Sequence, residues 1–555
     1  MGTSADFWPR GRSSVADRRG PLLLKPEQLD GLLERVRARA LEQTDYPLIE
    51  AVVQTLGLLR QALEQKKLSI ERLRGMLFGA KTESTSIITA TQKAALRRPE
   101  GKREGPPPGH GRRAAHSYWG ARRIEVLHEQ LHVGNVCPDC HTGKLYDLNK
   151  PAQLLSFTGA APIQAELHAC QRLRCSSCGV VFTAAAPEKV RAGKHDPSAA
   201  SMIALLRYGS GFPFHRLQGL QETLGIPLAA SVQWKLVHRK ATLLLPLFGQ
   251  LQREAAQGEV IYVDDTMVRI LTVVQVRPLP DEPEEQQLAE GQRKGSVTTG
   301  LVSRTAKATI VLYRSGSHYA GENLKELLVQ RDPQAGTPIQ MSDGLNRNRA
   351  ADVPVLRASC NAHSRRRFVE LIDDFPEECG KVVEAFRDVY RAEGQCRAGG
   401  LDPQHRLQHH QRHSAPVMAT LRAWASDRID SKQVEPNSTL GKAIRYMLNR
   451  WEELTLFLRV PGAPIDNNIV ERALKRAILH RKNSLFYQTL NGAAVGDLYM
   501  SLIATCIQNK ADPLDYLNAT EIHTAEVARD PGAWMPWNYR ETLSRATAPP
   551  AASSA

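Results

Sequence analysis

The chain has 555 residues, of which 42% are hydrophobic, and it carries a formal net charge of +15 at pH 7. This length exceeds what one hydrophobic core supports and predicts several domains. The excess of Lys and Arg favours a polyanionic partner, with nucleic acid ahead of a phospholipid surface. A run of about 18 uncharged apolar residues is absent, which argues against a membrane protein and predicts a cytoplasmic one.

The first 130 residues are dominated by charge and by one apolar repeat. Residues 1–45 mix Arg, Gly, Ser and Pro, and we expect a disordered basic tail there. Across 46–84, apolar residues recur at alternating spacings of three and four, the heptad pattern of a coiled coil or leucine zipper. An amphipathic helix packed on its own chain would show the same periodicity. Residues 85–130 are basic and Pro-rich, which predicts an extended linker.

Two Cys-x-x-Cys motifs follow, Cys137 to Cys140 and Cys175 to Cys178. Each motif presents two thiolates on a short turn, and four thiolates suit one structural Zn²⁺ ion. A pair of redox motifs would need a βαβ context, which the flanking sequence does not provide. The sequence therefore predicts a zinc ribbon in 131–190 with these four cysteines as ligands.

Residues 195–250 are helical in pattern. Two amphipathic segments within 215–239 flank Gly225 and Pro227, and basic residues lie on the second segment. This arrangement predicts a helix-turn-helix-like DNA-binding region. An ordinary helical hairpin accounts for the same pattern.

An apolar run from Glu259 to Leu271 carries two adjacent aspartates through its middle. The run predicts a buried strand, on which neighbouring side chains point to opposite faces, so only one of Asp264 and Asp265 can face a given site. A buried carboxylate needs a positive partner, and a divalent metal is the leading candidate. By itself, the run is better explained by a strand that ends at an Asp pair in a turn.

Two further carboxylates occupy similar places in the pattern. Asp343 ends a short apolar strand just before Gly344, and Glu471 lies about one turn into a helix that Asp466 or Asn467 would cap. Strand Asp, second strand Asp and helix Glu is the order of carboxylates in a ribonuclease-H-like core. On that scaffold three carboxylates hold two divalent ions, and Mg²⁺ or Mn²⁺ suits oxygen ligands. The helix also carries a group of candidate DNA contacts: Arg472, Lys475, Arg476, Arg481 and Lys482.

We therefore expect a multidomain α/β protein with a mixed-sheet catalytic core in two parts, 256–350 and 461–520. Residues 351–460 are predicted to form a helical insertion, and the Pro- and Ala-rich 521–555 a disordered C-terminal tail. Within the insertion, Cys360 and His363 are too few to make a metal site, so we expect a structural or substrate-orienting role for them. The insertion also holds four histidines that lack acidic partners in the sequence, which favours a solvated helix face: His405, His409, His410 and His413.

Several motifs of the chain resemble those of the insertion sequence 66 family of bacterial transposases, a DDE transposase group. The resemblance covers about residues 47–520. It is carried by Met76–Gly79 with Glu83 and Ser84, the two Cys-x-x-Cys motifs, Val263-Asp-Asp-Thr266, Ser342-Asp-Gly344, Cys360-Asn-Ala-His-Ser-Arg-Arg-Arg-Phe368, and Ile465-Asp-Asn-Asn-Ile-Val-Glu-Arg472 running on to Arg481-Lys-Asn483. The last two motifs are the most specific.

The resemblance implies that Asp264, Asp343 and Glu471 are the catalytic triad of a DNA transposase. Such an enzyme cleaves DNA at the ends of its insertion sequence and joins the ends to target DNA with two Mg²⁺ ions. It is expected to act as a homodimer in the nucleoid, with accessory proteins of the same element as further partners. Two alternatives stay open: a catalytically silent zinc-dependent DNA-binding regulator, and a nuclease that cleaves without joining.

Overall fold

This computed structural model describes residues 194–274 and 295–547, with shorter pieces inside 34–49, 130–146 and 160–188. Most of the expected basic tail, nearly all of the coiled coil and the linker, and Cys175 lie outside the described residues. The chain divides into two units, Met1–Arg98 and Pro99–Ala555. Every element described below belongs to the second unit.

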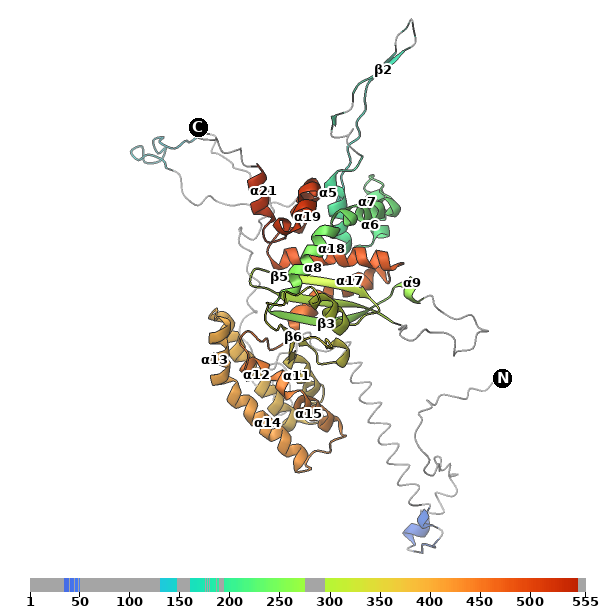
Figure 1. The fold of residues 1–555 in the computed structure, drawn as a ribbon, viewed down its shortest axis with the longest axis vertical. Helices are drawn as coiled ribbons and strands as arrows, with labels where there is room; N and C mark the ends of the chain where they lie inside the picture. Colours follow the sequence, from blue (N-terminus) through green and yellow to red (C-terminus); the bar gives the residue numbers. More distant parts are fainter. Residues whose placement is uncertain are drawn as a thin grey trace, which may run out of the picture. The chain divides into compact units, whose positions relative to one another are not determined.

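A five-stranded mixed sheet forms the centre of this unit (Figure 1). Its strand order is β5-β4-β3-β6-β7, in which β3, β4 and β5 are antiparallel while β6 and β7 run parallel to β3. The strands are β3 (Val260–Val268), β4 (Ser296–Arg304), β5 (Thr309–Gly316), β6 (Ile339–Ser342) and β7 (Leu356–Ser359). The expected mixed α/β architecture is confirmed, and the sheet is consistent with the core of a DDE transposase.

One strand corrects the sequence analysis. Residues 356–359, which we assigned to the helical insertion, form the edge strand β7, and its backbone pairs with β6. The four-residue strand is too short to show an alternating pattern, and its register is set by β6 rather than by its own sequence. The helical part therefore begins at Asn361.

Helices cover both faces of the sheet. The first half of β3 is buried on both sides, since Ile261 and Val263 on one face and Val260 and Tyr262 on the other are all at most 6% exposed. Helix α17 (Asn468–Ser484) packs on β3 and β4 from one face. On the other face, α8 (Leu245–Ala256) and α10 (Ala320–Leu328) pack on β4. The continuous apolar run in β3 is thus explained by burial between two helical layers.

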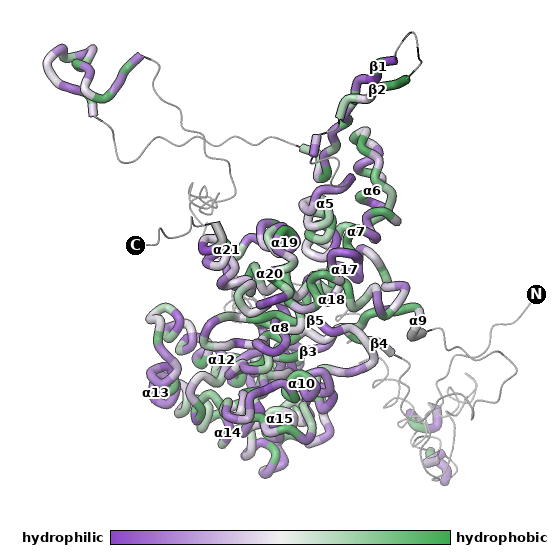
Figure 2. The backbone as a smooth tube through the Cα atoms, turned by 45° about the horizontal axis from the view of Figure 1, so that its top comes forward, coloured by the Kyte–Doolittle hydropathy of each residue, from purple (hydrophilic) through white to green (hydrophobic). Residues whose placement is uncertain are grey.

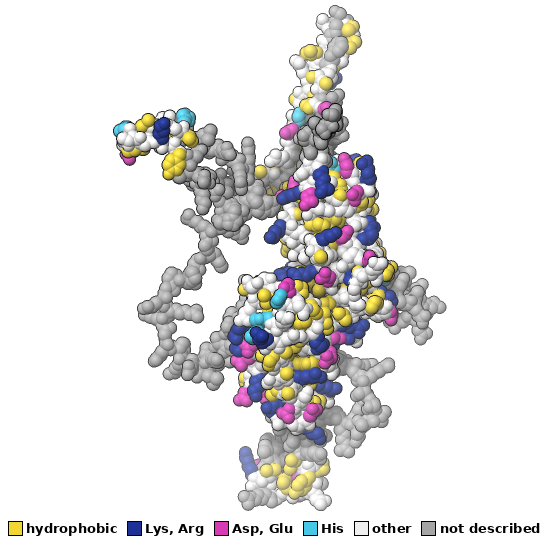
Figure 3. All heavy atoms as spheres, turned by 60° about the vertical axis from the view of Figure 1, so that its left-hand side comes forward, with side chains coloured by type: hydrophobic (Ala, Val, Ile, Leu, Met, Phe, Trp, Pro, Cys, Tyr) yellow, Lys and Arg dark blue, Asp and Glu magenta, His cyan; other side chains and the backbone are white. Residues whose placement is uncertain are grey.

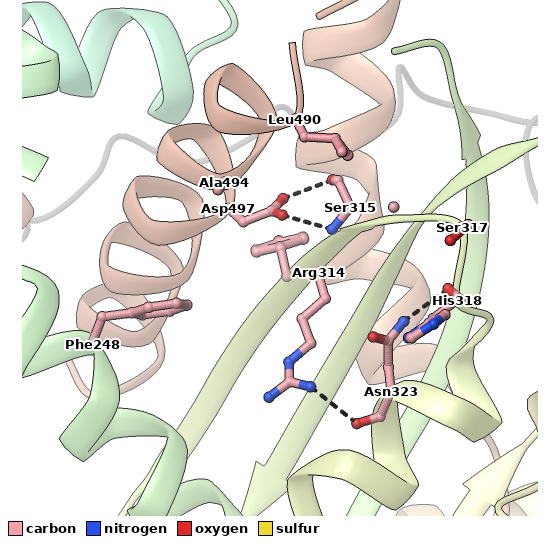
Figure 4. A pocket seen from close by; sticks show the side chains of 11 residues that line it. Phe248, Arg314, Ser315, Ser317, His318, Asn323, Leu490, Ala494 and Asp497 are labelled. Atoms are coloured by element: carbon pink, nitrogen blue, oxygen red, sulfur yellow. Dashed lines mark hydrogen bonds between the residues drawn. The ribbon is translucent and has the colours of Figure 1, made fainter. Parts of the chain in front are cut away.

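Helix α18 (Leu490–Gln508) covers the edge strand β5 with a ladder of polar side chains. Asp497, Ser501, Thr505 and Asn509 accept hydrogen bonds from the backbone N–H groups of Ser315, Tyr313, Val311 and Thr309. Four helical residues rise about 6 Å and two strand residues about 6.6 Å, so the two spacings match. Figure 4 shows the Asp497 end of the ladder, where the carboxylate binds both the N–H and the hydroxyl of Ser315.

The same helix is long and apolar enough to cross a membrane by length and composition alone, and Figure 2 shows much of it in green. However, 72% of its apolar window is buried inside the protein. Its polar ladder also supplies partners to the edge of the sheet, which would otherwise expose unpaired backbone groups. We therefore interpret α18 as a core helix.

The helical insertion contains α11 (Asn361–Val369), α12 (Pro376–Ala398), α13 (Pro403–His413), α14 (Ala415–Asp430), α15 (Thr439–Asn449), α16 (Trp451–Leu454) and η5 (Leu456–Leu458). The expectation that its four histidines lie on a solvated helix face fits His405 and His413, which are exposed, but is wrong for His410. His410 is fully buried, and its ring bonds Glu393 of α12 at 3.0 Å and Ser414 at 2.9 Å. The acidic partner comes from another helix and was invisible to the local pattern.

The remaining elements precede the sheet in the sequence or connect its strands. The expected helical region contains α5 (Pro197–Ala204), η2 (Leu205–Gly209), α6 (Phe214–Thr223) and α7 (Ala230–Leu243), and the short pieces are β1 (Arg172–Arg174), β2 (Val181–Thr183), α9 (Leu271–Val274) and η4 (Asn346–Asn348). Helices α6 and α7 match the two predicted segments.

The C-terminal region also differs from the expectation. Residues 513–547 form α19 (Pro513–Ile522), α20 (Thr524–Arg529), η6 (Pro531–Trp534) and α21 (Tyr539–Thr547). Trp534 and Tyr539 are buried, and the hydroxyl of Tyr516 donates to the carbonyl of Trp534 at 2.9 Å. These aromatic anchors fold a segment whose Pro and Ala content favoured disorder.

Candidate active site

The three predicted catalytic carboxylates come from three elements. Asp264 lies within β3, Asp343 directly follows β6, and Glu471 lies in the first turn of α17. Because β3 and β6 are adjacent parallel strands, side chains toward their carboxyl ends are neighbours. Asp343 and Glu471 are both close enough to Asp264 to raise its pKa. The fold therefore gathers these side chains at one place.

The electrostatics of this cluster are those of an uncompensated anionic site. The pKa of Asp264 is raised to about 7, chiefly because burial disfavours the charged carboxylate. The N–H of Asp265 opposes this by donating at 2.8 Å, while the charges of Asp343 and Glu471 add to it. In the described part of the chain, no Lys or Arg forms an ion pair with any of the three. Oxygen ligands gathered without a cation fit a divalent metal such as Mg²⁺.

Asn348 joins the two aspartates. Its side-chain amide donates to Asp343 at 2.8 Å and lies 3.5 Å from an oxygen of Asp264. The residue is fully buried in η4, and its own side-chain oxygen has no protein partner. A second bond, from the N–H of Leu345 to Asp343 at 3.0 Å, fixes the turn after β6. The loop after the second aspartate thus aligns both carboxylates.

Asp265 points away from this cluster, as the alternation of a strand predicts. Its carboxylate accepts the hydroxyl of Thr299 at 2.6 Å and the N–H of Ala320 at 2.9 Å. The second bond satisfies a free N–H in the first turn of α10, on the opposite face of the sheet. Asp265 therefore has a structural role in joining β3, β4 and α10.

Close packing of α17 on the sheet brings Glu471 to Asp264. Gly300 is the residue opposite Asp264 in the β3–β4 register. A Cβ atom at Gly300 would lie 2.8 Å from Leu474 and 3.2 Å from Val470, both of which belong to α17. Only glycine allows the helix to pack this closely, so Gly300 sets the distance between α17 and the site.

The start of α17 is fixed by two buried groups. The side chain of Asn467 donates to the carbonyl of Val263 at 3.0 Å, and its backbone N–H donates to the sulfur of Cys360 at 3.2 Å. Asn467 occupies the cap position, but Asp466 supplies the capping bond, accepting the N–H of Asn468 at 3.1 Å. Burial raises the pKa of Cys360 to about 12, so its thiol stays protonated and serves as an acceptor.

His363 is the neighbour of Glu471 on the other side. Its Nδ1 lies 3.6 Å from a carboxylate oxygen of Glu471. Cys360, His363 and Glu471 are close enough together to hold a metal ion. Cys360 already accepts a hydrogen bond from Asn467, so we interpret it as an anchor for α17. Nδ1 of His363 is buried and has no hydrogen-bond partner among the described residues.

The cations predicted to contact DNA divide into two groups. Arg472, Lys475 and Lys482 are exposed on α17. Arg476 instead donates to the carbonyl of Gly209 at 2.6 Å, and Arg481 donates to the hydroxyl of Thr266 at 3.2 Å. These two side chains hold α17 against η2 and β3. The three exposed side chains are therefore the better candidates for DNA contacts.

The first cysteine motif lies on a turn, as predicted. In the first motif, the sulfur of Cys140 accepts the N–H of Gly143 at 3.4 Å and the hydroxyl of Thr142 at 3.5 Å. Hydrogen bonds from Thr142 and Gly143 lower the pKa of Cys140 to about 6, which favours the thiolate that Zn²⁺ binds. Cys178 lies between β1 and β2, which form an antiparallel pair. Since Cys175 is outside the described residues, the joining of the two motifs stays a prediction.

Sequence reasoning missed Asn348, and it missed a group of three side chains beside Asp343. Tyr446 of α15 donates its hydroxyl to the carbonyl of Asp343 at 2.8 Å, and its ring carries the guanidinium groups of Arg367 and Arg450. Only Arg367 lies in a motif that we singled out. Tyr446 and Arg450 are about a hundred residues from Asp343, so no local pattern could join them.

Comparisons with known proteins indicate the family of the chain. A sequence model described as "Transposase IS66 family" matches residues 193–495, which include all three carboxylates. Three proteins of Sinorhizobium fredii (strain NBRC 101917 / NGR234), each titled an uncharacterized protein, are similar to the chain. No solved structure matches it.

The similarity to these relatives differs in extent. Protein y4jD is 23% identical and the match covers 88% of this chain and 98% of y4jD. For y4qI the identity is 27%, and the match covers 65% of this chain and 66% of y4qI, just under two thirds of its length. For y4hP the identity is 25%, and the match covers 62% of this chain and 63% of y4hP. The family match spans more than half of the chain, from α5 to α18, and the chain belongs to the IS66 family of transposases.

Proposed function

We propose that the chain is a DNA transposase that cleaves at the ends of its insertion sequence and joins the freed 3′ hydroxyl to target DNA. The observation that carries the proposal is the convergence of Asp264, Asp343 and Glu471 in a member of a transposase family. Three carboxylates around a buried position, with no Lys or Arg partner among the described residues, suit phosphoryl transfer assisted by divalent metals.

The residues of the chain have distinct roles in this proposal. Two Mg²⁺ ions, when bound, would activate the attacking oxygen and stabilise the leaving oxygen. Asp264 and Asp343 would hold them, with Asn348 keeping these two carboxylates aligned. Glu471 would complete the site, with His363 beside it.

DNA would lie along the exposed face of α17. Arg472 follows Glu471 directly, and Lys475 and Lys482 continue the positive charge along the helix. Lys and Arg side chains are also spread over the surface in Figure 3, in keeping with the net charge of +15. Phosphate contacts of this kind position DNA without reading its sequence.

The regions that precede the core would recognise the ends of the insertion sequence. The zinc ribbon, held by Cys137, Cys140, Cys175 and Cys178, and the pair α6 and α7 are the candidates for binding element ends. The predicted coiled coil in 46–84 would pair two protomers, so that two ends are processed together. One Zn²⁺ ion per chain would stabilise the ribbon.

The proposal is tested with labelled DNA that carries the inverted repeats flanking the coding region. Wild-type protein with Mg²⁺ is expected to cleave the repeat end and to join it to a target plasmid. Asp264→Asn, Asp343→Asn and Glu471→Gln should each abolish both products while keeping the fold. Asp352→Asn is the matched control, because Asp352 is an exposed carboxylate with a positive φ of 58° that asparagine tolerates.

Other results would select other functions. Cleavage without joining would favour a nuclease, and tight binding of the repeats without chemistry would favour a DNA-binding regulator. Full activity in any of the three carboxylate variants would overturn the assigned site.

A further inference from the structure

Two arginines stack on one tyrosine ring beside Asp343. The Cζ atom of Arg367 lies 3.8 Å from the ring centroid of Tyr446, and that of Arg450 lies 4.0 Å from it. Two guanidinium groups at such distances would collide on a single face, so they flank the ring from opposite faces. Both distances are well inside the range of about 6 Å for a cation–π contact.

This stack is fixed to the turn that carries Asp343. The hydroxyl of Tyr446 donates to the carbonyl of Asp343 at 2.8 Å. Arg450 donates to the carbonyl of Gly344 through Nε at 3.3 Å and through a terminal nitrogen at 3.1 Å. Gly344 has a φ of +80°, and a Cβ atom there would lie 2.8 Å from Nε of Arg450. Glycine therefore provides both the turn and the space for the arginine.

Neither arginine has an acidic partner among the described residues, although Arg450 also bonds the backbone of Gly344. In the described part of the chain, neither guanidinium forms an ion pair with a carboxylate, and Arg367 has no hydrogen bond to the backbone. The nearby carboxylate of Asp343 bonds Asn348 and Leu345 instead. Two like charges held on one ring repel each other, so the arrangement favours an anion that both can bind.

Helix α11 connects the stack with the candidate active site. Arg367 and His363 are four residues apart on α11, so they share one face of that helix. His363 contacts Glu471 at one end of this face, and Arg367 meets Tyr446 at the other. A single helix thus connects the Glu471 side of the carboxylate cluster with the Asp343 side.

We propose that Arg367 and Arg450, stacked on Tyr446, form a clamp for a backbone phosphate of DNA next to the three carboxylates. Arginine suits this role because its planar fork matches phosphate oxygens and stacks on aromatic rings. The helical insertion, through α15, would therefore contribute to DNA binding at the site. This inference rests on the proposed function, since the ligand is the DNA that the enzyme would process.

The test measures DNA binding without metal, so that chemistry does not enter. A fluorescent duplex of the element end is titrated with full-length wild type, Arg367→Gln and Arg450→Gln at several salt concentrations. Each variant is expected to bind about 5- to 10-fold more weakly, and the slope of log affinity against log salt should fall by about one for each lost phosphate contact. Arg445→Gln is the control, because Arg445 is exposed on the same helix as Tyr446 and carries the same charge.

Further variants separate phosphate binding from structural support. Arg367→Gln is the cleaner substitution, since Arg450 also holds the backbone of Gly344. Tyr446→Phe keeps the ring and should retain affinity, whereas Tyr446→Leu removes the stacking surface and should weaken binding as the arginine variants do. Replacing phosphates one at a time with neutral methylphosphonates should reveal one position at which Arg367→Gln no longer has any effect.

The outcomes are distinct. In one outcome, wild type binds DNA, the affinities of both arginine variants lie within twofold of that of Arg445→Gln, and the salt slopes are unchanged. That outcome would overturn the clamp and leave the proposed function intact. An absence of DNA binding by folded wild-type protein would overturn both. Loss of affinity with an unchanged salt slope would show that the arginines support the fold instead, and that result too would overturn the clamp.

Discussion

Gly300 lies directly opposite Asp264 in the β3–β4 ladder, and Leu474 of α17 packs into the space that a side chain at Gly300 would fill. One missing Cβ atom therefore links the strand that carries the first carboxylate to the helix that carries the third. The relationship explains why a glycine occurs in the middle of a buried central strand, where it otherwise weakens a sheet.

Gly300→Ala is expected to push α17 away from β3 and to displace Glu471. We expect a loss of about 1–3 kcal/mol of unfolding free energy from overpacking, and a loss of about 100-fold in strand transfer because the reacting groups are misaligned. Urea denaturation and the joining assay measure the two effects. Gly316→Ala is the control, because a Cβ atom at Gly316 meets nothing within 4 Å. Equal activity of the two variants would refute the spacing role.

Asn348→Asp should turn an aligning amide into a further carboxylate in an already repulsive cluster. At pH 8 without metal, the free energy of unfolding is expected to fall by about 1–3 kcal/mol, since an added buried charge would be unpaired. Added Mg²⁺ should restore most of this loss. Thermal melts with and without Mg²⁺ provide the measurement, and Asn346→Asp, an exposed position in the same η4 turn, is the control. Equal melting curves for the two variants would contradict this role.

The ladder between α18 and β5 makes a prediction about stability alone. Thr505→Val removes a hydroxyl that binds both the N–H and the carbonyl of Val311, which leaves two buried backbone groups without partners. The expected cost is about 1–3 kcal/mol, with faster hydrogen exchange at the Val311 amide. Thr505→Ser keeps the hydroxyl and should lose much less. Equal stability of Thr505→Ser and Thr505→Val would show that the ladder does not stabilise the edge strand β5.

The ion cluster of Glu393 predicts a pH dependence. Burial raises the pKa of Glu393, but the hydrogen bond from His410, the charge and hydrogen bond of Arg406 and the hydrogen bond from Arg397 outweigh it and bring the pKa to about 2. Because the folded pKa is lowered, this stabilisation is complete above the ordinary value of 4.5 and is lost as the pH falls toward 2. The shift corresponds to a contribution on the order of 3 kcal/mol.

Glu393→Gln should therefore be less stable than wild type at pH 7 and should lose this part of the dependence between pH 4.5 and 2. Denaturant titrations at a series of pH values follow the difference. Glu384→Gln on the same helix is the control, because that carboxylate is half exposed. An unchanged pH profile in Glu393→Gln would show that the cluster does not stabilise the fold.

The sequence was sufficient for features that a short stretch encodes. The apolar run around Asp264, the strand that ends at Asp343 and the helix that begins near Asn467 all form where the pattern predicted them. Features that depend on distant partners were missed. The buried state of His410 depends on Glu393, and β7 depends on pairing with β6. The stack on Tyr446 likewise joins residues from two helices to one turn, which no periodicity reveals.

Metal binding by the carboxylate cluster is the most direct test of the account. Mn²⁺ binding to the full-length protein with element-end DNA, followed by electron paramagnetic resonance, should show two bound ions per chain in wild type and in Asp352→Asn. Asp264→Asn, Asp343→Asn and Glu471→Gln should each lose at least one ion while the protein remains folded and bound to DNA. Two tightly bound Mn²⁺ ions in Asp264→Asn would contradict the assignment of these three residues as one metal-dependent site.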